Sequence, residues 1–440
     1  MNMHHKKGWW LWANRGLLTM EGLAIGTAAA LVIGLFRLCL YTIAPALTRW
    51  FSGWQEDWWI MPLWLIAVIT AARLLGWMVR RVPLISGSGI PQTELVITGR
   101  LHLSRHDWLR VLPAKFLSCL LSSLSGLSLG RTAPSIQMGA AAASLISGLW
   151  EHFSFSGHIH IAAGAAAGLA ATFGAPAAGL LFAFEELHLR FTRNGFLLIA
   201  ASVLAAELTI RLLFGFGPIF PCYAPSLPGP RLLLLLLPFG ALMGISGALY
   251  NKALIGTKNA EALHTPLSQD WRILPPMLIA FVLAFTFPAV LGGGEGLVNE
   301  LCALVETPSS MLEPLLLLAA AKILFSLFSY TGNVPGGIIM PMLCIGAILG
   351  ALSGQCLLTA QLIEPEDWHL FIISGMTGFF SACIRSPFTA SALAVETTGS
   401  LSCLPGAALA SFAAAWTANR LHSPPIYESM RAAIVVPRRR

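Results

Sequence analysis

The chain has 440 residues, of which 56% are hydrophobic and only 11% charged, and its formal net charge is +7. Because a soluble domain carries about 25% charged residues, this composition predicts a polytopic membrane protein instead of a soluble one. The apolar runs show no two-residue alternation, which favours helices over a closed barrel. The basic residues form no face on a soluble domain, which argues against nucleic acid as a partner.

Apolar runs and glycine-rich breaks divide the chain into five parts. We expect a cytoplasmic interfacial segment, a first membrane repeat, a polar linker, a second membrane repeat, and a pore-lining final helix with a basic tail. In that order these parts cover residues 1–19, 20–250, 251–272, 273–420 and 421–440. Within the first repeat, the predicted helices cover residues 20–48, 58–77, 112–129, 134–150, 159–186, 196–214 and 231–254.

Arginines gather in three places along the chain. One group lies between residues 80 and 110, a second comprises Arg190 and Arg193, and a third comprises Arg431 and residues 438–440. Loops on the cytoplasmic side of a membrane carry an excess of lysine and arginine. We therefore expect all three groups, and both termini, to face the cytoplasm.

The second half of the chain repeats the first at a nearly constant offset. Four pairs lie 207 residues apart: Gly87 and Gly294, Lys115 and Lys322, Gly130 and Gly337, and Pro134 and Pro341. Two further pairs lie 211 residues apart: Pro176 and Pro387, and Glu185 and Glu396. Repeats with helix breaks at corresponding positions are typical of transporters, whose substrate site lies at the repeat interface near mid-membrane.

Three short segments are candidate helix starts inside the membrane. Residues 87–91, 130–134 and 337–341 each contain a glycine, three further residues and a proline. Glycine permits unusual backbone angles, and proline sets the first helical turn. The first N–H groups of such helices have no intrahelical acceptor and carry partial positive charge, so they suit an anion. The alternative is that these residues form only packing contacts and kinks.

Carboxylates within apolar sequence are the other candidate functional groups. Glu185 and Glu186 end a helix of small residues, and one of them could relay protons; a salt-bridged helix-end carboxylate is the alternative. Glu295 and Glu396 are weaker candidates for the same role. The repeated lysines are expected to be structural.

These motifs, in this order, resemble those of the CLC family of chloride channels and chloride/proton antiporters. Residues 87–91 (Gly-Ser-Gly-Ile-Pro) match its first signature, and residues 130–134 (Gly-Arg-Thr-Ala-Pro) are similar to its Gly-Arg-Glu-Gly-Pro signature. Residues 337–341 (Gly-Ile-Ile-Met-Pro) are similar to its Gly-x-Phe-x-Pro signature. The likeness runs from about residue 20 to 430. It implies an all-α membrane fold of about eighteen helices in two inverted repeats, whose broken helices meet at a central anion site.

The resemblance also implies roles for individual residues. The residues expected to bind the anion are Ser88, Gly89, Ile90, Ile339, Met340 and Tyr427. The gate position falls on Arg131, Thr132 and Ala133, and the internal proton-transfer position falls on Glu186. A homodimer in the bacterial inner (plasma) membrane is expected, with one pore in each subunit and both termini in the cytoplasm.

Thr132 is the most consequential departure from the family pattern, because it replaces the gating glutamate. A threonine hydroxyl does not titrate near neutral pH and cannot imitate the charge of a bound anion. We therefore expect passive, proton-uncoupled transport of chloride. The alternatives are a chloride/proton antiporter that uses Glu186 and another proton route, and a transporter of fluoride or bicarbonate.

An enzyme is not expected, since the chain contains no metal-binding motif such as His-Glu-x-x-His and no catalytic constellation. No cofactor or metal is expected either. Chloride enters this interpretation as the transported substrate.

Overall fold

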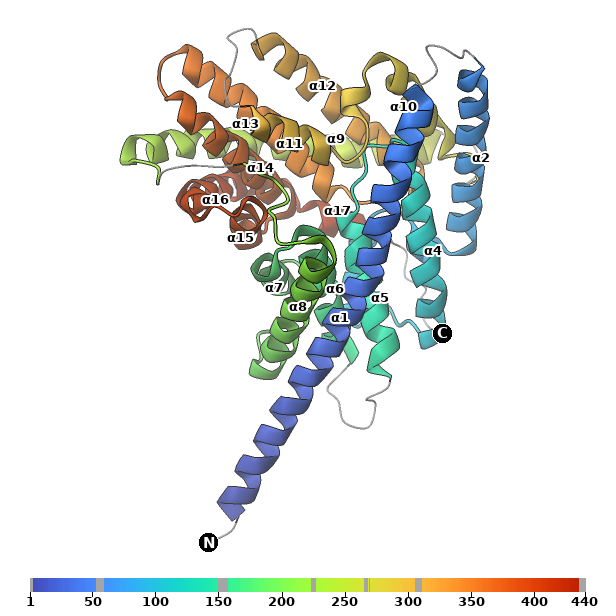
Figure 1. The fold of residues 1–440 in the computed structure, drawn as a ribbon, viewed down its shortest axis with the longest axis vertical. Helices are drawn as coiled ribbons and strands as arrows, with labels where there is room; N and C mark the ends of the chain where they lie inside the picture. The colour runs from blue at the N-terminus through green and yellow to red at the C-terminus, as the bar shows by residue number, and fades with distance from the viewer. Residues whose placement is uncertain are drawn as a thin grey trace.

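The computed structural model of the chain describes residues 3–52, 59–148, 157–222, 227–264, 268, 270–304 and 311–434. These residues form 17 α-helices joined by turns and short 3-10 segments (Figure 1). The helices of the first half are α1 (Met3–Ser52), α2 (Ile60–Arg81), α3 (Ile90–Ile97), α4 (Arg105–Leu124), α5 (Thr132–Ser147), α6 (Gly157–Phe173), α7 (Pro176–Glu185) and α8 (Arg193–Phe214). Those of the second half are α9 (Pro230–His264), which packs against α14 and α16, α10 (Leu274–Thr286), α11 (Glu295–Ala303), α12 (Leu312–Ser329), α13 (Ile339–Thr359), α14 (Trp368–Ile384), α15 (Pro387–Thr398), α16 (Leu404–Arg420) and α17 (Ile426–Ala432).

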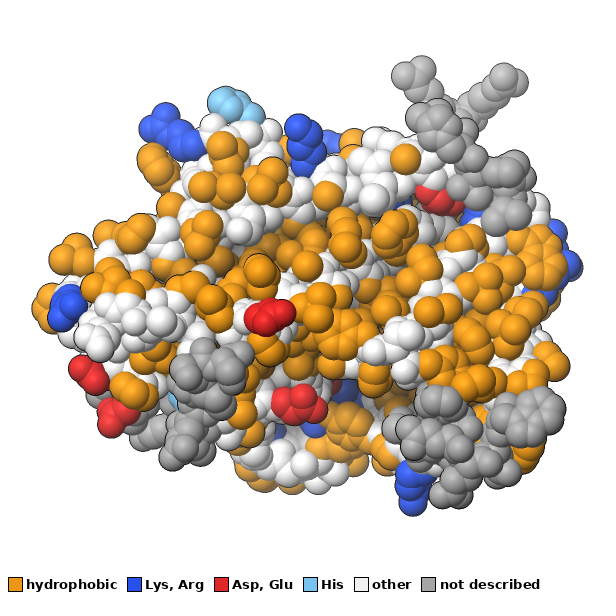
Figure 2. Space-filling view, turned by 90° about the horizontal axis from the view of Figure 1, so that it is seen from above, with side chains coloured by type: hydrophobic (Ala, Val, Ile, Leu, Met, Phe, Trp, Pro, Cys, Tyr) orange, Lys and Arg blue, Asp and Glu red, His pale blue; other side chains and the backbone are white. Residues whose placement is uncertain are grey.

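Seven of the described helices contain stretches long and apolar enough to cross a membrane. These stretches are Arg15–Leu47, Ile60–Arg81, Arg193–Phe214, Pro230–Glu261, Leu312–Ser329, Ile339–Thr359 and Leu401–Arg420. Large hydrophobic side chains are exposed along them, as on α8, where Leu204, Leu208 and Leu212 point outward. Figure 2 shows hydrophobic side chains spread over much of one face of the molecule. Such a surface fits lipid, so the fold is that of a membrane protein.

The two halves of the chain occupy different regions of the molecule. In Figure 1 the teal and green helices α5 to α8 fill the lower part, and the orange and red helices α13 to α16 lie at the upper left. Within each half, a pair of helices packs through glycine. Gly139 of α5 lies against the backbone of Gly164 in α6, and Gly346 of α13 lies against Gly375 in α14 in the same way. A Cβ atom at any of these positions would approach a backbone oxygen to 2.4 Å or less, so the close approach requires glycine.

Reciprocal contacts relate the two halves by a two-fold axis. Glu185, at the end of α7, accepts hydrogen bonds from the backbone N–H groups of Phe388 and Thr389, at the start of α15. Glu396 of α15 accepts the corresponding bonds from Ala177 and Ala178, at the start of α7. Each carboxylate therefore stabilises the free N–H groups of the other half's helix. An exchange of partners in this form is the signature of two-fold symmetry.

The repeated lysines also have matching surroundings. Lys115 donates to the carbonyl oxygens of Ile85 and Gly87, at 2.8 and 2.7 Å, and Lys322 donates to those of Val290 and Gly292, both at 2.8 Å. Both side chains are buried. Each ammonium group holds the broken backbone that precedes a short helix, α3 or α11, which fits the structural role expected for it.

The structure differs from the sequence expectations at several helix boundaries; α4, for example, begins at Arg105 and ends at Leu124, where residues 112–129 were expected. The glycine-rich stretch 159–186 is two helices, α6 and α7, because Gly174 adopts a positive φ of 57° and Pro176 begins a new helix. α9 continues to His264, well into the expected linker, and α1 begins at Met3, within the expected interfacial segment.

Candidate functional site

The three candidate helix starts meet at the interface of the repeats. α3, α5 and α13 begin at Ile90, Thr132 and Ile339, directly after the glycine of each segment or within two residues of it. Gly130 and Gly337 exchange backbone hydrogen bonds of 2.7 and 2.9 Å, and Gly336 donates to the carbonyl oxygen of Gly87 at 3.0 Å. These glycine contacts place the starts of the three helices in one buried cluster, as the sequence predicted.

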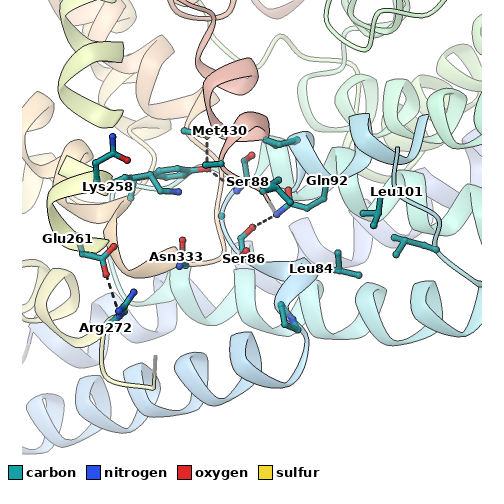
Figure 3. A pocket seen from close by; sticks show the side chains of 18 residues that line it. Leu84, Ser86, Ser88, Gln92, Leu101, Lys258, Glu261, Arg272, Asn333 and Met430 are labelled. Atoms are coloured by element: carbon teal, nitrogen blue, oxygen red, sulfur yellow. Dashed lines mark hydrogen bonds and ion pairs between the residues drawn. The ribbon is translucent and has the colours of Figure 1, made fainter. Parts of the chain in front are cut away.

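Ser88 lines a cavity of about 600 Å³, which we call the Ser88 cavity (Figure 3). Its walls come from the segments before and after α3, from the end of α9, and from α17. The side chains on its wall include Ser86, Gln92, Lys258, Arg272, Tyr330 and Met430. The wall also includes Glu261, whose carboxylate lies 3.9 Å from the Arg272 guanidinium, and apolar residues such as Leu84 and Leu101, so the cavity combines apolar surface with a few polar and charged groups.

The backbone at Ser88 is held by an aromatic hydroxyl that the sequence did not single out. The N–H of Ser88 donates to the hydroxyl oxygen of Tyr330 at 3.0 Å, and the Tyr330 hydroxyl donates to the sulfur of Met430 at 3.6 Å. Gly89 has a φ of 90°, which favours glycine and lets α3 begin at Ile90. The hydroxyl oxygen of Ser88 accepts a long hydrogen bond of 3.4 Å from the N–H of Ile90.

Thr132 and Tyr427 share one property. Both side chains are buried, and neither hydroxyl has a hydrogen-bond partner within the described part of the chain. Other buried hydroxyls, such as those of Ser128 and Ser374, share this property, so it leaves the two side chains free to donate without identifying a ligand.

The second repeat contributes Ile339 and Met340 to the same cluster. Both residues are buried in the first turn of α13. Met340 lies against Gly130, and Ala133 lies against Gly337, where an added Cβ would approach within 2.8 Å. The space at this crossing is therefore defined by small residues from both repeats.

Ser88, Thr132 and Tyr427 do not line a single open cavity. Ser88 borders the Ser88 cavity, whereas Thr132 and Tyr427 are absent from its wall. Thr132 lies at the crossing of the helix starts, and Tyr427 lies in α17, which packs against α3; both side chains are buried. On the far side of Thr132, the neighbouring Arg131 forms an ion pair with Glu295 at 2.9 Å.

Glu295 borders a second cavity of about 230 Å³, which we call the Glu295 cavity. Its wall includes Arg37 and Tyr41 from the later part of α1, Glu207 and Arg211 from the end of α8, Asn299 from α11 and Glu396 from α15. The wall is thus mainly charged and polar, in contrast to the apolar helices around it.

The two cavities lie on opposite sides of the membrane. Residues just after the end of α2, and residues at the end of α9, line the Ser88 cavity. The later part of α1 and the end of α8 line the Glu295 cavity. α1 and α2 are consecutive spans, so their C-terminal ends lie on opposite sides. α8 and α9 are also consecutive spans, and their C-terminal ends lie on opposite sides for the same reason. α3 and α11 occupy corresponding positions of the repeats, since Lys115 and Lys322 hold the backbone before each helix in the same way. Because these two helices border cavities on opposite sides, the repeats are inverted.

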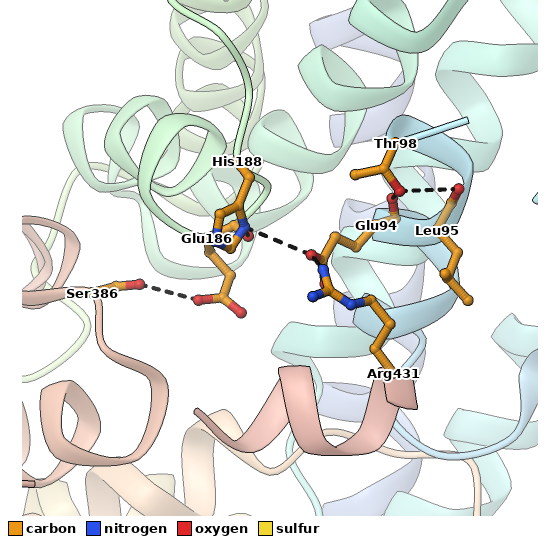
Figure 4. A network of polar contacts seen from close by, with 7 residues as sticks. All are labelled: Glu94, Leu95, Thr98, Glu186, His188, Ser386 and Arg431. Atoms are coloured by element: carbon orange, nitrogen blue, oxygen red, sulfur yellow. Dashed lines mark hydrogen bonds and ion pairs between the residues drawn. The ribbon is translucent and has the colours of Figure 1, made fainter. Parts of the chain in front are cut away.

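Glu186 lies in a polar network near the Ser88 side (Figure 4). Its carboxylate accepts a hydrogen bond from the Ser386 hydroxyl at 3.2 Å, and its backbone oxygen lies 2.6 Å from Nδ1 of His188. His188 in turn lies 3.6 Å from the carboxylate of Glu94, which also pairs with Arg431. The side chain of His188 is 65% exposed, and it contacts Glu186 only at the backbone carbonyl oxygen, whereas the Glu186 carboxylate is buried beside Ser386.

The other candidate carboxylates have structural partners. Glu185 and Glu396 each cap a helix of the opposite repeat, as described above, which matches the helix-end alternative for Glu185. Glu295 is paired with Arg131. No group of three histidine, cysteine, aspartate or glutamate side chains with the spacing of a metal site occurs in the described ranges.

Comparison with known proteins gives consistent results. Residues 67–419 match the family model described as voltage gated chloride channel. The H(+)/Cl(-) exchange transporter ClcA of Vibrio parahaemolyticus is 30% identical over 419 residues, which cover 92% of this chain and 87% of that protein. The protein of the same name from Vibrio cholerae is 31% identical over 424 residues, with coverage of 93% and 87%.

Solved structures agree with these sequence matches. A slow cyanobacterial Cl-/H+ antiporter superposes with a TM-score of 0.85 at 26% identity, covering 94% of this chain and 97% of that one. A CLC-type fluoride/proton antiporter, at 21% identity and a TM-score of 0.76, shares the fold. Since the family match spans most of its length and its inverted repeats meet at broken helices, the chain belongs to the voltage-gated chloride channel family of anion-transporting membrane proteins.

Proposed function

We propose that this protein conducts chloride passively across the membrane, without obligatory exchange for protons. The observation that carries the proposal is the residue at the gate position. Thr132 begins α5 with a buried, unpartnered hydroxyl, where the relatives' exchange mechanism calls for a carboxylate that moves and carries a proton. A hydroxyl donates a hydrogen bond to an anion but neither competes with it nor carries a proton past it.

Chloride is the proposed substrate because the hydrogen-bond donors near the meeting point of the α5 and α13 starts are neutral. The unpartnered hydroxyls of Thr132 and Tyr427, with the N–H groups at the starts of α5 and α13, offer partial charges to a dehydrated anion. Such donors replace hydration without the tight binding of a full positive charge, which suits conduction. The exchangers that resemble this chain are named for chloride, which supports the same substrate.

The competing proposal is a chloride/proton antiporter. It is favoured by the names of the relatives and by the buried carboxylate of Glu186, which accepts a hydrogen bond from Ser386. The exposed His188 lies next to Glu186, on its backbone carbonyl oxygen. A complete proton path would also need a titratable group between Glu186 and the Glu295 cavity, and Thr132 does not supply one.

The proposed arrangement in the cell is a homodimer in the bacterial inner membrane. The Ser88 cavity would face the cytoplasm, since the basic residues Arg80 and Arg81 end α2 beside it. The helix starts that form the buried cluster come from one chain, so each subunit would hold its own pathway.

Purified protein in liposomes tests the proposal. Chloride-loaded vesicles receive the potassium carrier valinomycin, and chloride efflux and external pH are recorded together. Passive conduction predicts chloride efflux with no change in pH, at the same rate in wild type and Glu186→Gln. Proton movement against its gradient, lost in Glu186→Gln, would establish the antiporter instead. Replacing chloride by fluoride or bicarbonate in the same vesicles tests the choice of anion.

A further inference from the structure

The repeats place different side chains at the starts of their corresponding short helices. Glu295 begins α11 directly after Gly294, as Ile90 begins α3 directly after Gly89, so the structural offset here is 205 residues and not the 207 of the sequence repeat. Gly294 has a φ of 91° and Gly89 a φ of 90°, so α11 and α3 both begin after a left-handed glycine. α11 therefore begins with a carboxylate that borders the Glu295 cavity, whereas α3 begins with a buried isoleucine.

Glu295, which lines the Glu295 cavity, pairs with Arg131, the residue before Thr132; Arg131 is not itself on the cavity wall. Oε1 of Glu295 accepts from Nη2 of Arg131 at 2.9 Å and from the hydroxyl of Tyr41 at 3.4 Å. The guanidinium of Arg131 also lies over the Tyr41 ring, 5.3 Å from its centroid. The two charged side chains are only 12% and 28% exposed, for Arg131 and Glu295 respectively, so this pair is partly shielded from water.

The other charged side chains around the Glu295 cavity contact groups other than Arg131. Glu207 pairs with Arg211 on the same face of α8, and Glu396 accepts the N–H groups of Ala177 and Ala178. The guanidinium of Arg37 lies over the rings of Tyr41 and Phe214. Arg131 is thus the cation placed beside Thr132, and a carboxylate of the chain itself covers it.

We propose that the Arg131 guanidinium is an outer anion-binding position and that Glu295 occupies it as a tethered competitor. An anion entering from the Glu295 cavity displaces the carboxylate before it reaches Thr132. Glu295 therefore sets the chloride concentration at which this face of the protein saturates, and it has no such effect on the opposite face. This inference rests on the proposed anion pathway through Thr132.

Membrane vesicles of known orientation test the proposal. Right-side-out and inside-out vesicles from cells producing the protein present opposite faces to added radioactive chloride, and initial uptake is measured against its concentration. For Glu295→Gln, we expect the chloride concentration at half-maximal uptake to fall about threefold when chloride is added on the side of the Glu295 cavity, because one partly shielded competing charge is removed. The same concentration should stay unchanged when chloride is added on the other side. Glu300→Gln, an exposed carboxylate of the same short helix, is the matched control and should change neither face.

A purely structural ion pair would give a different result. Loss of a purely structural pair would lower the amount of folded protein, or would change the half-saturating chloride concentration equally on both faces. Either result, without a shift confined to one face, would overturn the proposal. If Glu295→Gln does not accumulate, Glu295→Asp moves the charge one methylene away from Arg131 and should give a smaller shift in the same direction; an unshifted Asp variant also overturns it. Proton coupling in the wild type would overturn the passive mechanism but leave a face-specific shift intact, so the two failures are distinguishable.

Discussion

The hydroxyl oxygen of Tyr330 accepts the backbone N–H of Ser88 at 3.0 Å, across 242 residues of sequence. Tyr330 ends α12 in the second repeat, and Ser88 precedes α3 in the first. This bond fixes the backbone of the helix start that borders the larger cavity. A side chain from one repeat therefore shapes the cavity wall built by the other.

Two buried tyrosines should respond differently to the loss of their hydroxyls. Tyr330→Phe leaves the buried Ser88 N–H without its acceptor, so we expect a loss of about 1–3 kcal/mol of stability. Tyr427→Phe removes a hydroxyl that has no partner within the described residues, so its melting temperature should match that of wild type. Thermal unfolding of both variants in detergent checks this. Equal destabilisation by the two substitutions would contradict the hydrogen-bond assignment.

The reciprocal helix caps predict equal effects in the two repeats. Glu185→Ala removes the acceptor of two N–H groups and of the Thr389 hydroxyl, and Glu396→Ala removes the acceptor of two N–H groups. We expect each to lower stability by about 1.5–3 kcal/mol, as for hydrogen bonds to charged groups. Glu300→Ala serves as the control because its side chain is exposed. An unchanged free energy of unfolding in the Glu185 or Glu396 variant would show that these helix caps contribute little to stability.

The buried lysines give a second symmetric prediction. Lys115→Met and Lys322→Met each leave two carbonyl oxygens without a donor, and both should lower stability by about 2–4 kcal/mol. The exposed Lys252→Met on α9 is the matched control. Melting temperatures in detergent provide the comparison, and wild-type stability in either buried-lysine variant would argue against the role assigned to them.

Much of this architecture could be predicted from the sequence because its signals are local. Glycine followed by proline marks helix starts, and the repeat in Lys, Pro and Glu positions identifies the two halves. The partners of these residues could not be predicted. Tyr330 is a single tyrosine at the end of an apolar helix, and its bond to Ser88 depends on how the repeats fold together. The pairing of Arg131 with Glu295 likewise spans 164 residues, so no local pattern indicates it.

The break at Gly174 was missed for a different reason. Residues 159–186 form one apolar run of small side chains, which is typical of a single long membrane helix. The positive φ of Gly174 and the proline at 176 divide that run, and the division lets Glu396 reach the start of α7. A glycine and a proline two residues apart were the available signal.

The central claim is that Thr132 uncouples anion transport from protons. It is tested most directly by comparing wild type with Thr132→Glu in liposomes that carry an outward chloride gradient, with internal pH and chloride recorded together. We predict that wild type releases chloride without moving protons, and that Thr132→Glu, which restores a carboxylate at the start of α5, drives protons against their gradient. Uphill proton movement by the wild-type protein would contradict the account.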